Sequence, residues 1–155
     1  MKQATQAALL VAVLGFLGLP GLRIVDADSD PTSEVLETAA RFQKAAISND
    51  TQFLAQVFDE HVTHFHPGEA YRFTGRDRLV REFSSAAKNQ ENQFFEMVEP
   101  KAQFPSRDVA VLTYYISEHW TEKGTSRSVS EKATEVYAKQ DGKWKMIHSH
   151  YSVNP

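Results

Sequence analysis

The spacing of apolar residues along the chain changes near residue 92. Before that point, apolar residues recur at intervals of three and four, which is typical of amphipathic helices. After it, apolar and polar residues alternate over long segments, which is typical of strands with one buried face. The pattern predicts helices in the first half of the chain and a series of strands in the second half.

Three helices are predicted in the first half. The first spans residues 35–47, the second spans residues 51–58 after the capping sequence Ser48-Asn49-Asp50, and the third begins at Gly75 to Asp77. Between the second and third helices, residues 60–66 read as a short strand that Pro67-Gly68 ends, and a hairpin-like segment follows at residues 70–74.

Four longer strands are predicted in the second half, over residues 94–104, 109–121, 126–139 and 143–153. Short turn sequences separate them, and Asp141-Gly142 is a strong signal for a two-residue hairpin. Neither the helices nor the sheet can bury an apolar face alone, so they should pack together. The expected fold class is α+β, with a curved, mostly antiparallel sheet that forms a cone with the three helices.

The first residues differ in kind from the rest. Lys2 precedes an uncharged apolar run and then Pro20-Gly21, and Val25-Asp26-Ala27 fits a signal-peptidase site. We therefore expect a signal peptide at 1–27, a linker at 28–33, and one domain at 34–155 in a secreted or periplasmic protein without a membrane contact. An uncleaved anchor is the alternative, although the run is short against the roughly 20 residues that span a bilayer.

Composition narrows the possible chemistry. The chain has no cysteine, so thiolate metal sites and cysteine nucleophiles are excluded. A formal net charge of −3 argues against nucleic acid as a partner. Because P-loop, dinucleotide-binding, nucleophile-elbow and H-E-x-x-H motifs are missing from the sequence, we expect no cofactor.

Residues 141–155 carry a pattern of D-G-K-W, two aliphatic residues, H-x-H, Ser and a final Pro. This pattern resembles the closing strand of the association domain of calcium/calmodulin-dependent protein kinase II and its bacterial SnoaL-like relatives, in the nuclear transport factor 2-like superfamily. The likeness extends back through 131–137 and 63–67. It implies a cone-shaped pocket and a homodimer paired through its sheets, but no particular reaction, because many functions share this fold.

The resemblance also orients the sheet. Positions that carry pocket arginines in the kinase relatives hold Ile116, Glu135 and Tyr151 here. Side chains alternate along strands, so the predicted pocket face holds Tyr114, Ile116, Glu118, Trp120, Glu131, Ala133, Glu135, Tyr137, Ile147, Ser149 and Tyr151. With the arginines replaced, the expected ligand is neutral, aromatic or cationic.

Glu135 is the candidate catalytic residue. A carboxyl group buried in the cone opposite a tyrosine hydroxyl could act as a general base. Glu118 and Glu131 are the alternates. The residues predicted to bind the ligand are Tyr114, Ile116, Glu118, Trp120, Tyr137, Ser149 and Tyr151. A glutamate that is solvated, or paired with Lys132 or Arg127, is the competing interpretation.

Histidines at two-residue spacing form two pairs, His64 with His66 and His148 with His150. Such pairs can bind metal, but no acidic residue accompanies either pair in a known motif, so no metal is assigned. His148 and His150 should instead lie on the sheet face opposite the pocket and hydrogen-bond across strands or at a subunit contact.

Three functions remain open from the sequence. The first is a domain that binds a small, mostly apolar molecule and self-associates, the second is an isomerase, cyclase or dehydratase with a pocket Glu or His as base, and the third is a pure oligomerisation module. Residues 109–116 have apolar side chains on both faces of the strand, which supports a homodimer.

Export gives the first testable prediction. The exported protein should begin near Asp28, because the signal peptidase should cut after Ala27. Mass spectrometry of the protein recovered outside the cytoplasm measures this directly. An intact Met1 on that protein would show that the leader is retained.

Overall fold

The computed structural model describes residues 30–154, so the predicted signal peptide and its cleavage point lie outside the described residues. In order, the elements are α1 (Pro31–Ser48), α2 (Thr51–Val57), β1 (Phe58–Phe65), β2 (Phe73–Thr74), α3 (Arg76–Asn89), β3 (Glu91–Ser106), β4 (Val109–Glu122), β5 (Thr125–Gln140) and β6 (Lys143–Val153). Each of the predicted helices and strands is present, with ends shifted by a few residues. In this part of the chain no helix is long and apolar enough to cross a bilayer.

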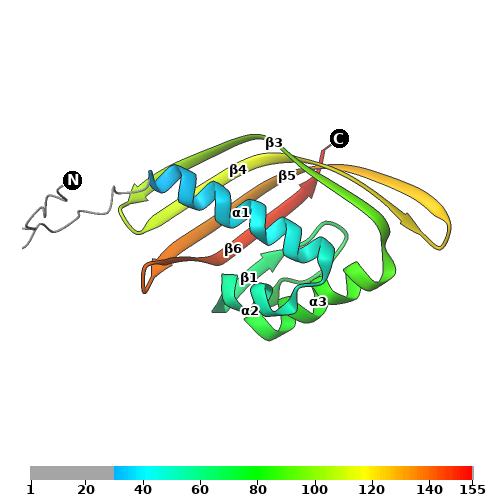
Figure 1. Ribbon diagram of the computed structural model, residues 1–155, viewed down its shortest axis with the longest axis horizontal. Helices are drawn as coiled ribbons and strands as arrows, with labels where there is room; N and C mark the ends of the chain where they lie inside the picture. Colours follow the sequence, from blue (N-terminus) through cyan, green and yellow to red (C-terminus); the bar gives the residue numbers. More distant parts are fainter. Residues whose placement is uncertain (1–29, 155) are drawn as a thin grey trace, which may run out of the picture.

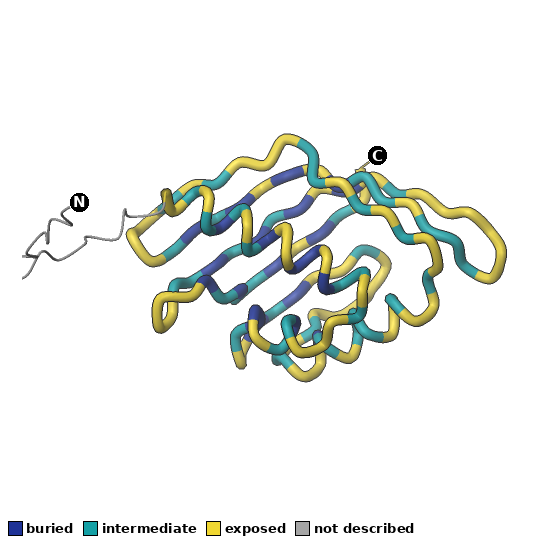
Figure 2. Tube along the Cα trace, in the orientation of Figure 1, coloured by how far each residue is buried: buried dark blue, intermediate teal, exposed yellow. Residues whose placement is uncertain are grey.

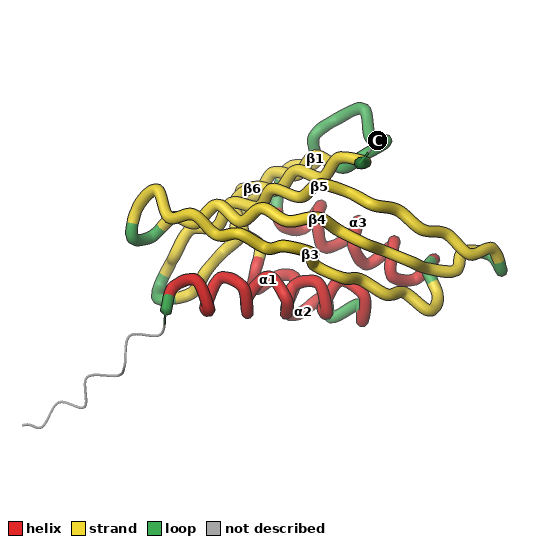
Figure 3. Tube along the Cα trace, turned by 90° about the horizontal axis from the view of Figure 1, so that it is seen from above, coloured by secondary structure: helices red, strands yellow, loops and turns green. Residues whose placement is uncertain are grey.

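The six strands form one curved sheet in the order β2-β1-β6-β5-β4-β3. β1 pairs with β6 in parallel and every other pairing is antiparallel, as the predicted meander requires. Asp141 and Gly142 both have positive φ, at 50° and 73°, which is the conformation of a tight hairpin turn. All three helices cover the same face of the sheet (Figures 1 and 3). The α+β fold class is confirmed.

The beginning of α1 is set by local capping. The Asp30 side chain accepts a hydrogen bond from the Thr32 amide at 3.1 Å, and Pro31 occupies the first helical turn, where its missing N–H costs nothing. Residues 31–33 are therefore helical rather than part of the predicted linker. At the other end, Asn49 adopts the left-handed conformation that terminates helices.

The core lies where α1 crosses the helix-facing side of the sheet. The buried positions of α1 follow the predicted stripe, and those of β4 alternate from Ala110 through Leu112 and Tyr114 to Ile116. Figure 2 shows these buried positions as dark segments on the helix and on the strands behind it. The Phe42 ring joins α1 to β1 and α3 through edge contacts with Phe58 and Phe83, at centroid distances of 5.6 Å and 5.3 Å.

The alternation along β6 is interrupted. Val136 pairs with His148 but the next residue of β5, Tyr137, pairs with Met146, so one extra residue is inserted in β6. Met146 is fully buried, whereas Ile147 is only half-buried. Simple alternation cannot anticipate this bulge, and the pocket-side position of Ile147 stays a prediction.

The opposite face of the sheet carries His148, His150 and Phe65. His148 Nδ1 is hydrogen-bonded to Thr63 Oγ1 of β1 at 2.7 Å, as expected for a histidine that links strands outside the pocket. The Phe65 ring lies between the two histidines, with centroid distances of 6.0 Å to His148 and 5.5 Å to His150. None of the helices between residues 30 and 154 covers this face (Figure 3).

Candidate functional site

A cavity of about 390 Å3 lies between the helices and the sheet. We call it the main cavity. The sheet contributes polar and apolar groups to its wall, namely Phe95, Ile116, Glu118, Trp120, Val129, Glu131, Tyr151 and Val153. The helices contribute Gln43, Ala46, Ile47, Phe83, Ala86 and Ala87, and the remaining lining residues are His66, Pro67, Gly68, Gln90 and Gln93. A volume in this range is typical of small-molecule sites.

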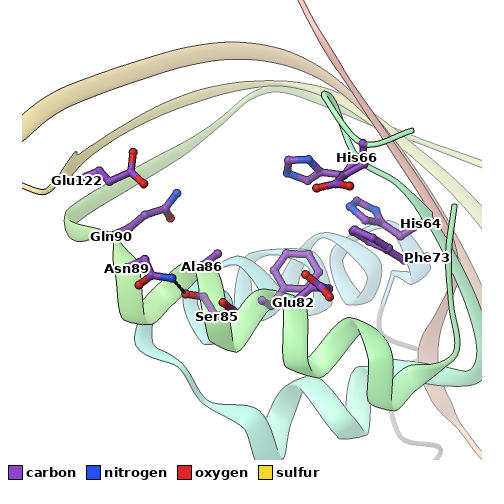
Figure 4. A pocket seen from close by; sticks show the side chains of 11 residues that line it. His64, His66, Phe73, Glu82, Ser85, Ala86, Asn89, Gln90 and Glu122 are labelled. Atoms are coloured by element: carbon purple, nitrogen blue, oxygen red, sulfur yellow. Dashed lines mark hydrogen bonds between the residues drawn. The ribbon is translucent and has the colours of Figure 1, made fainter. Parts of the chain in front are cut away.

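A second space of about 280 Å3 adjoins the main cavity, because His66, Phe83, Ala86 and Gln90 line both. Figure 4 shows His64 and His66 at one end of this space and Gln90 and Glu122 at the other. The α3 side chains of Glu82, Ser85 and Asn89 form the wall below them.

Acidic groups line both spaces, and arginine pairs only with acidic groups of the adjoining space: Glu82 with Arg78 and Glu122 with Arg127. Within residues 30–154, no Lys or Arg side chain lines either space. Glu131 is 8% exposed and forms no ion pair with another described residue. Burial raises the pKa of the Glu131 carboxyl group above its usual value; His66 opposes this and Glu118 adds to it. The wall of the main cavity thus contains a carboxyl group that either carries a negative charge or binds a proton.

Glu135 lies beneath the main cavity and is 0% exposed. Its carboxyl group accepts three hydrogen bonds from tyrosine hydroxyls, at 2.7 Å from Tyr114, 2.7 Å from Tyr137 and 2.6 Å from Tyr151. Gln43 of α1 donates to the Tyr114 hydroxyl at 2.7 Å. We call these five residues the tyrosine network.

Electrostatics in the tyrosine network follow from its burial. Complete removal from water raises the pKa of Glu135, although hydrogen bonds from the three tyrosines oppose the shift. Burial and the nearby carboxyl group raise the pKa of Tyr114, Tyr137 and Tyr151 well above the usual value, so these hydroxyls stay protonated and donate. Glu135 is thus buried against three tyrosines, and it is not among the residues that line the main cavity.

The predicted site residues divide into two groups. Four of them, Ile116, Glu118, Trp120 and Tyr151, line the main cavity. Tyr114, Tyr137 and Glu135 belong to the buried network instead, and Ser149 is buried against His64. Tyr151 belongs to both groups, because it lines the cavity and donates to Glu135. The catalytic role given to Glu135 stays a prediction, and Glu131 is the carboxyl group of β5 that reaches the cavity.

His64 is a buried, neutral imidazole in the wall of the adjoining space. Its Nδ1 is hydrogen-bonded to Ser149 Oγ at 2.8 Å, and its ring contacts that of Tyr151 at a centroid distance of 5.1 Å. Burial, together with the other histidines nearby, lowers its pKa to about 3. Such a ring is a weak base at neutral pH, and it serves better as a hydrogen-bonding group. Among the described residues, no group of three or more His, Asp or Glu side chains is arranged to hold a metal ion.

Four of the polar residues that line the main cavity were not predicted as part of the pocket. Gln43 lies on the apolar face of α1, Gln90 and Gln93 flank the junction of α3 and β3, and His66 follows β1. A glutamine carries no charge or motif, so only the packing of α1 and β3 around the cavity brings these amides together. For Gln43 alone, a polar residue within a buried helical stripe was an available signal.

A family model for the SnoaL-like domain matches residues 35–154. The chain belongs to the SnoaL-like family. The match begins within α1 and ends with β6, so the family covers the whole helix and sheet assembly described above.

Solved structures share the fold of this SnoaL-like domain. A protein assigned as a scytalone dehydratase from Novosphingobium aromaticivorans is 13% identical with a TM-score of 0.74, over 80% of this chain and 84% of that chain. One assigned as a calcium/calmodulin-dependent protein kinase II association domain from Xanthomonas campestris is 21% identical with a TM-score of 0.72, over 84% and 91%. The kinase hub of S. rosetta is 23% identical with a TM-score of 0.70, over 81% and 98%. These likenesses establish the fold, which enzymes and assembly domains share.

The tyrosine network generates a prediction for Glu135→Gln. The amide oxygen can still accept from two tyrosines while its N–H group donates to the third, so the fold should persist. In the wild type the folded-state pKa is raised, so the stabilisation from protonated Glu135 is present below the unfolded pKa and is lost as pH rises through the folded value. The variant should therefore gain stability relative to the wild type as pH rises from about 4.

Chemical denaturation across this pH range measures the difference, and carbon-detected NMR titration of Glu135 measures its pKa. Glu96→Gln, at an exposed position of β3, is the matched control and should give a curve parallel to that of the wild type. Parallel curves for Glu135→Gln as well, with an ordinary glutamate titration, would contradict the buried network.

Proposed function

We propose that this SnoaL-like domain binds a small, mostly apolar molecule that is neutral or positively charged in its main cavity. We also propose that it does so outside the cytoplasm, as an assembly of two copies. The observation that carries the binding proposal is Glu131, a carboxyl group that is 8% exposed in the cavity wall and has no ion-pair partner among the described residues.

Charge determines which ligands suit the main cavity. An anionic ligand would bring a second negative charge beside Glu131 and Glu118 without a lysine or arginine in the wall to compensate. A neutral ligand can donate a hydrogen bond to Glu131, and a cation can pair with it. Neutral and cationic ligands are also the ones expected from the family resemblance, because this chain has other residues at the positions where the kinase relatives carry pocket arginines.

The rest of the wall favours an apolar body. Ile47 and Phe83 approach from the helices, and Ile116, Trp120 and Val129 approach from the sheet. Enclosure of an aromatic or branched ligand among these side chains would remove apolar surface from water, at about 25 cal/mol per Å2. Recognition would then combine this burial with a few polar contacts, as is usual for small-molecule sites.

The binding proposal is tested with indole as a neutral probe and indole-3-acetate as its anionic counterpart. We expect indole to shift the methyl NMR signals of Ile47 and Ile116, and the carboxylate to bind at least tenfold more weakly. Ala46→Trp should fill the cavity from α1 and weaken indole binding at least tenfold, whereas Ala40→Trp, on the same helix outside the main cavity, should leave binding unchanged. Equal binding of both probes would contradict the proposal.

Acid–base catalysis of an isomerase, cyclase or dehydratase type is a second candidate. It is favoured by the raised pKa of Glu131 in a wall that also holds the Tyr151 hydroxyl. Two of the solved structures with this fold are assigned as dehydratases. New product resonances from a bound probe in the same NMR samples would favour this candidate over binding alone.

Self-association is supported by the uncovered sheet face. Phe65 on β1 and Tyr115 on β4 are 44% and 45% exposed, and both lie on the face away from the helices. Exposed aromatic side chains on one open sheet face are typical of an interface. Domains named as kinase hubs or association domains share the fold, which is consistent with this use of the surface.

Light scattering at micromolar concentration should give the mass of two chains. Tyr115→Lys should shift the mass toward that of a monomer, because a charge at the centre of a buried face is costly. Tyr71→Lys is the matched control, since Tyr71 is 85% exposed in the loop between β1 and β2 and should be neutral. A wild-type protein that is monomeric under these conditions would contradict the proposal.

A further inference from the structure

Two side-chain amide oxygens in the main cavity have no hydrogen-bond partner. Gln90 Oε1 and Gln93 Oε1 are both buried and unpaired, and both residues line the main cavity. A buried acceptor without a partner costs free energy. A small rotation of either side chain would bring its oxygen to the cavity surface, where an N–H or O–H group of a ligand would supply the missing donor.

The orientation of the Gln93 side-chain amide is fixed by the hydrogen bond that its nitrogen makes. Its Nε2 donates to Glu118 Oε1 at 2.6 Å, and a carboxylate oxygen can only accept from that group. Gln93 Oε1 is therefore an acceptor, and turning the amide over would break the bond to Glu118. The amide and the carboxylate together form one connected set of acceptors on β3 and β4.

His66 contributes another acceptor. Its Nδ1 lies 2.7 Å from the Pro67 carbonyl oxygen, which can only accept, so Nδ1 carries the hydrogen. In the neutral ring the lone pair is then on Nε2. His66 also lines both spaces, and Figure 4 shows its ring across from Gln90, which lies at the other end of the adjoining space.

The polar wall of the main cavity therefore contains several acceptors from separate elements. Glu131, Glu118, Gln93, Gln90 and His66 all present oxygen or nitrogen lone pairs, while no lysine or arginine of the described chain lines the cavity. A ligand with a single donor could satisfy only one of these groups. A planar cation with several N–H groups could satisfy a carboxylate and amide oxygens at the same time.

We propose that the ligand of the main cavity is an amidine or guanidine on an aromatic body, held by Glu131 together with Gln93 and Gln90. This inference rests on the proposed binding function and narrows its ligand class. The aromatic body would lie against Phe83, Ile116 and Trp120, and the cationic end would face the acceptors. The charge requirement comes from Glu131, and the requirement for several donors comes from the unpaired amides.

Three probes of nearly equal shape test the inference: 2-naphthamidine, 2-naphthamide and 2-naphthoate. Calorimetric titration of the folded domain should give an affinity for the amidine at least tenfold above that for the amide. The carboxylate should bind more weakly than both. The expected order follows from the charge-assisted hydrogen bonds that only the amidine can make with Glu131.

Two variants test which side chains recognise the amidine group. Glu131→Gln keeps the shape of the side chain and should reduce the preference for amidine over amide to less than threefold, whereas Glu96→Gln, on the exposed side of β3, should leave it unchanged. Gln93→Met removes the amide acceptor and keeps a side chain of similar volume. It should weaken amidine binding at least threefold, with little effect on the contacts that the naphthalene rings make. If Glu131→Gln fails to fold, Gln93→Met alone decides the outcome.

The outcomes separate the two proposals. Equal affinity for amidine and amide, or a preference that survives both variants, would overturn this inference and leave the binding function in place. If none of the three probes binds at millimolar concentration and indole also fails to bind, both the inference and the proposed function are wrong.

Discussion

The Glu135 carboxyl group is fully removed from water in the middle of the sheet, and the surrounding structure is arranged to satisfy it. Tyrosines from β4, β5 and β6 donate to it, and Gln43 connects it to α1 through the Tyr114 hydroxyl. An unpaired carboxylate at this depth would cost several kcal/mol. The register of three strands and the approach of α1 must therefore be held so that every donor reaches its acceptor.

This network also connects the apolar core to the main cavity. Its tyrosines belong to the same buried cluster as Phe42, Leu112 and Met146. Two of its members, Gln43 and Tyr151, also line the wall of the main cavity. A ligand that contacts Tyr151 would thus touch a group whose orientation is fixed by Glu135, which places the network in a supporting position behind the site.

The fold by itself is compatible with several activities, because proteins assigned as dehydratases and as assembly domains share it with this chain. The composition of the cavity wall is more informative about the ligand than the fold. Carboxyl groups, side-chain amides and a histidine line the main cavity, and no lysine or arginine of the described chain lines it. Unpaired acceptors and a buried carboxyl group, rather than overall shape, therefore favour one class of ligand.

The sequence by itself determined the order and type of the helices and strands, because periodic burial of apolar side chains is a local property of the pattern. The resemblance to the kinase association domains added the helix-facing side of β4 and β5, but the burial of Glu135 was left open beside a solvated or paired glutamate. The sequence could not determine the bulge in β6 beside Ile147 or the burial of Met146, since an inserted residue changes the register without a change in composition. Nor could it show that Glu131, rather than Glu135, reaches the cavity, or that Gln90, Gln93 and His66 gather beside it. These residues come from separate elements, and only the packing of α1, α3 and the loop after β1 against the curved sheet decides which of them share one space.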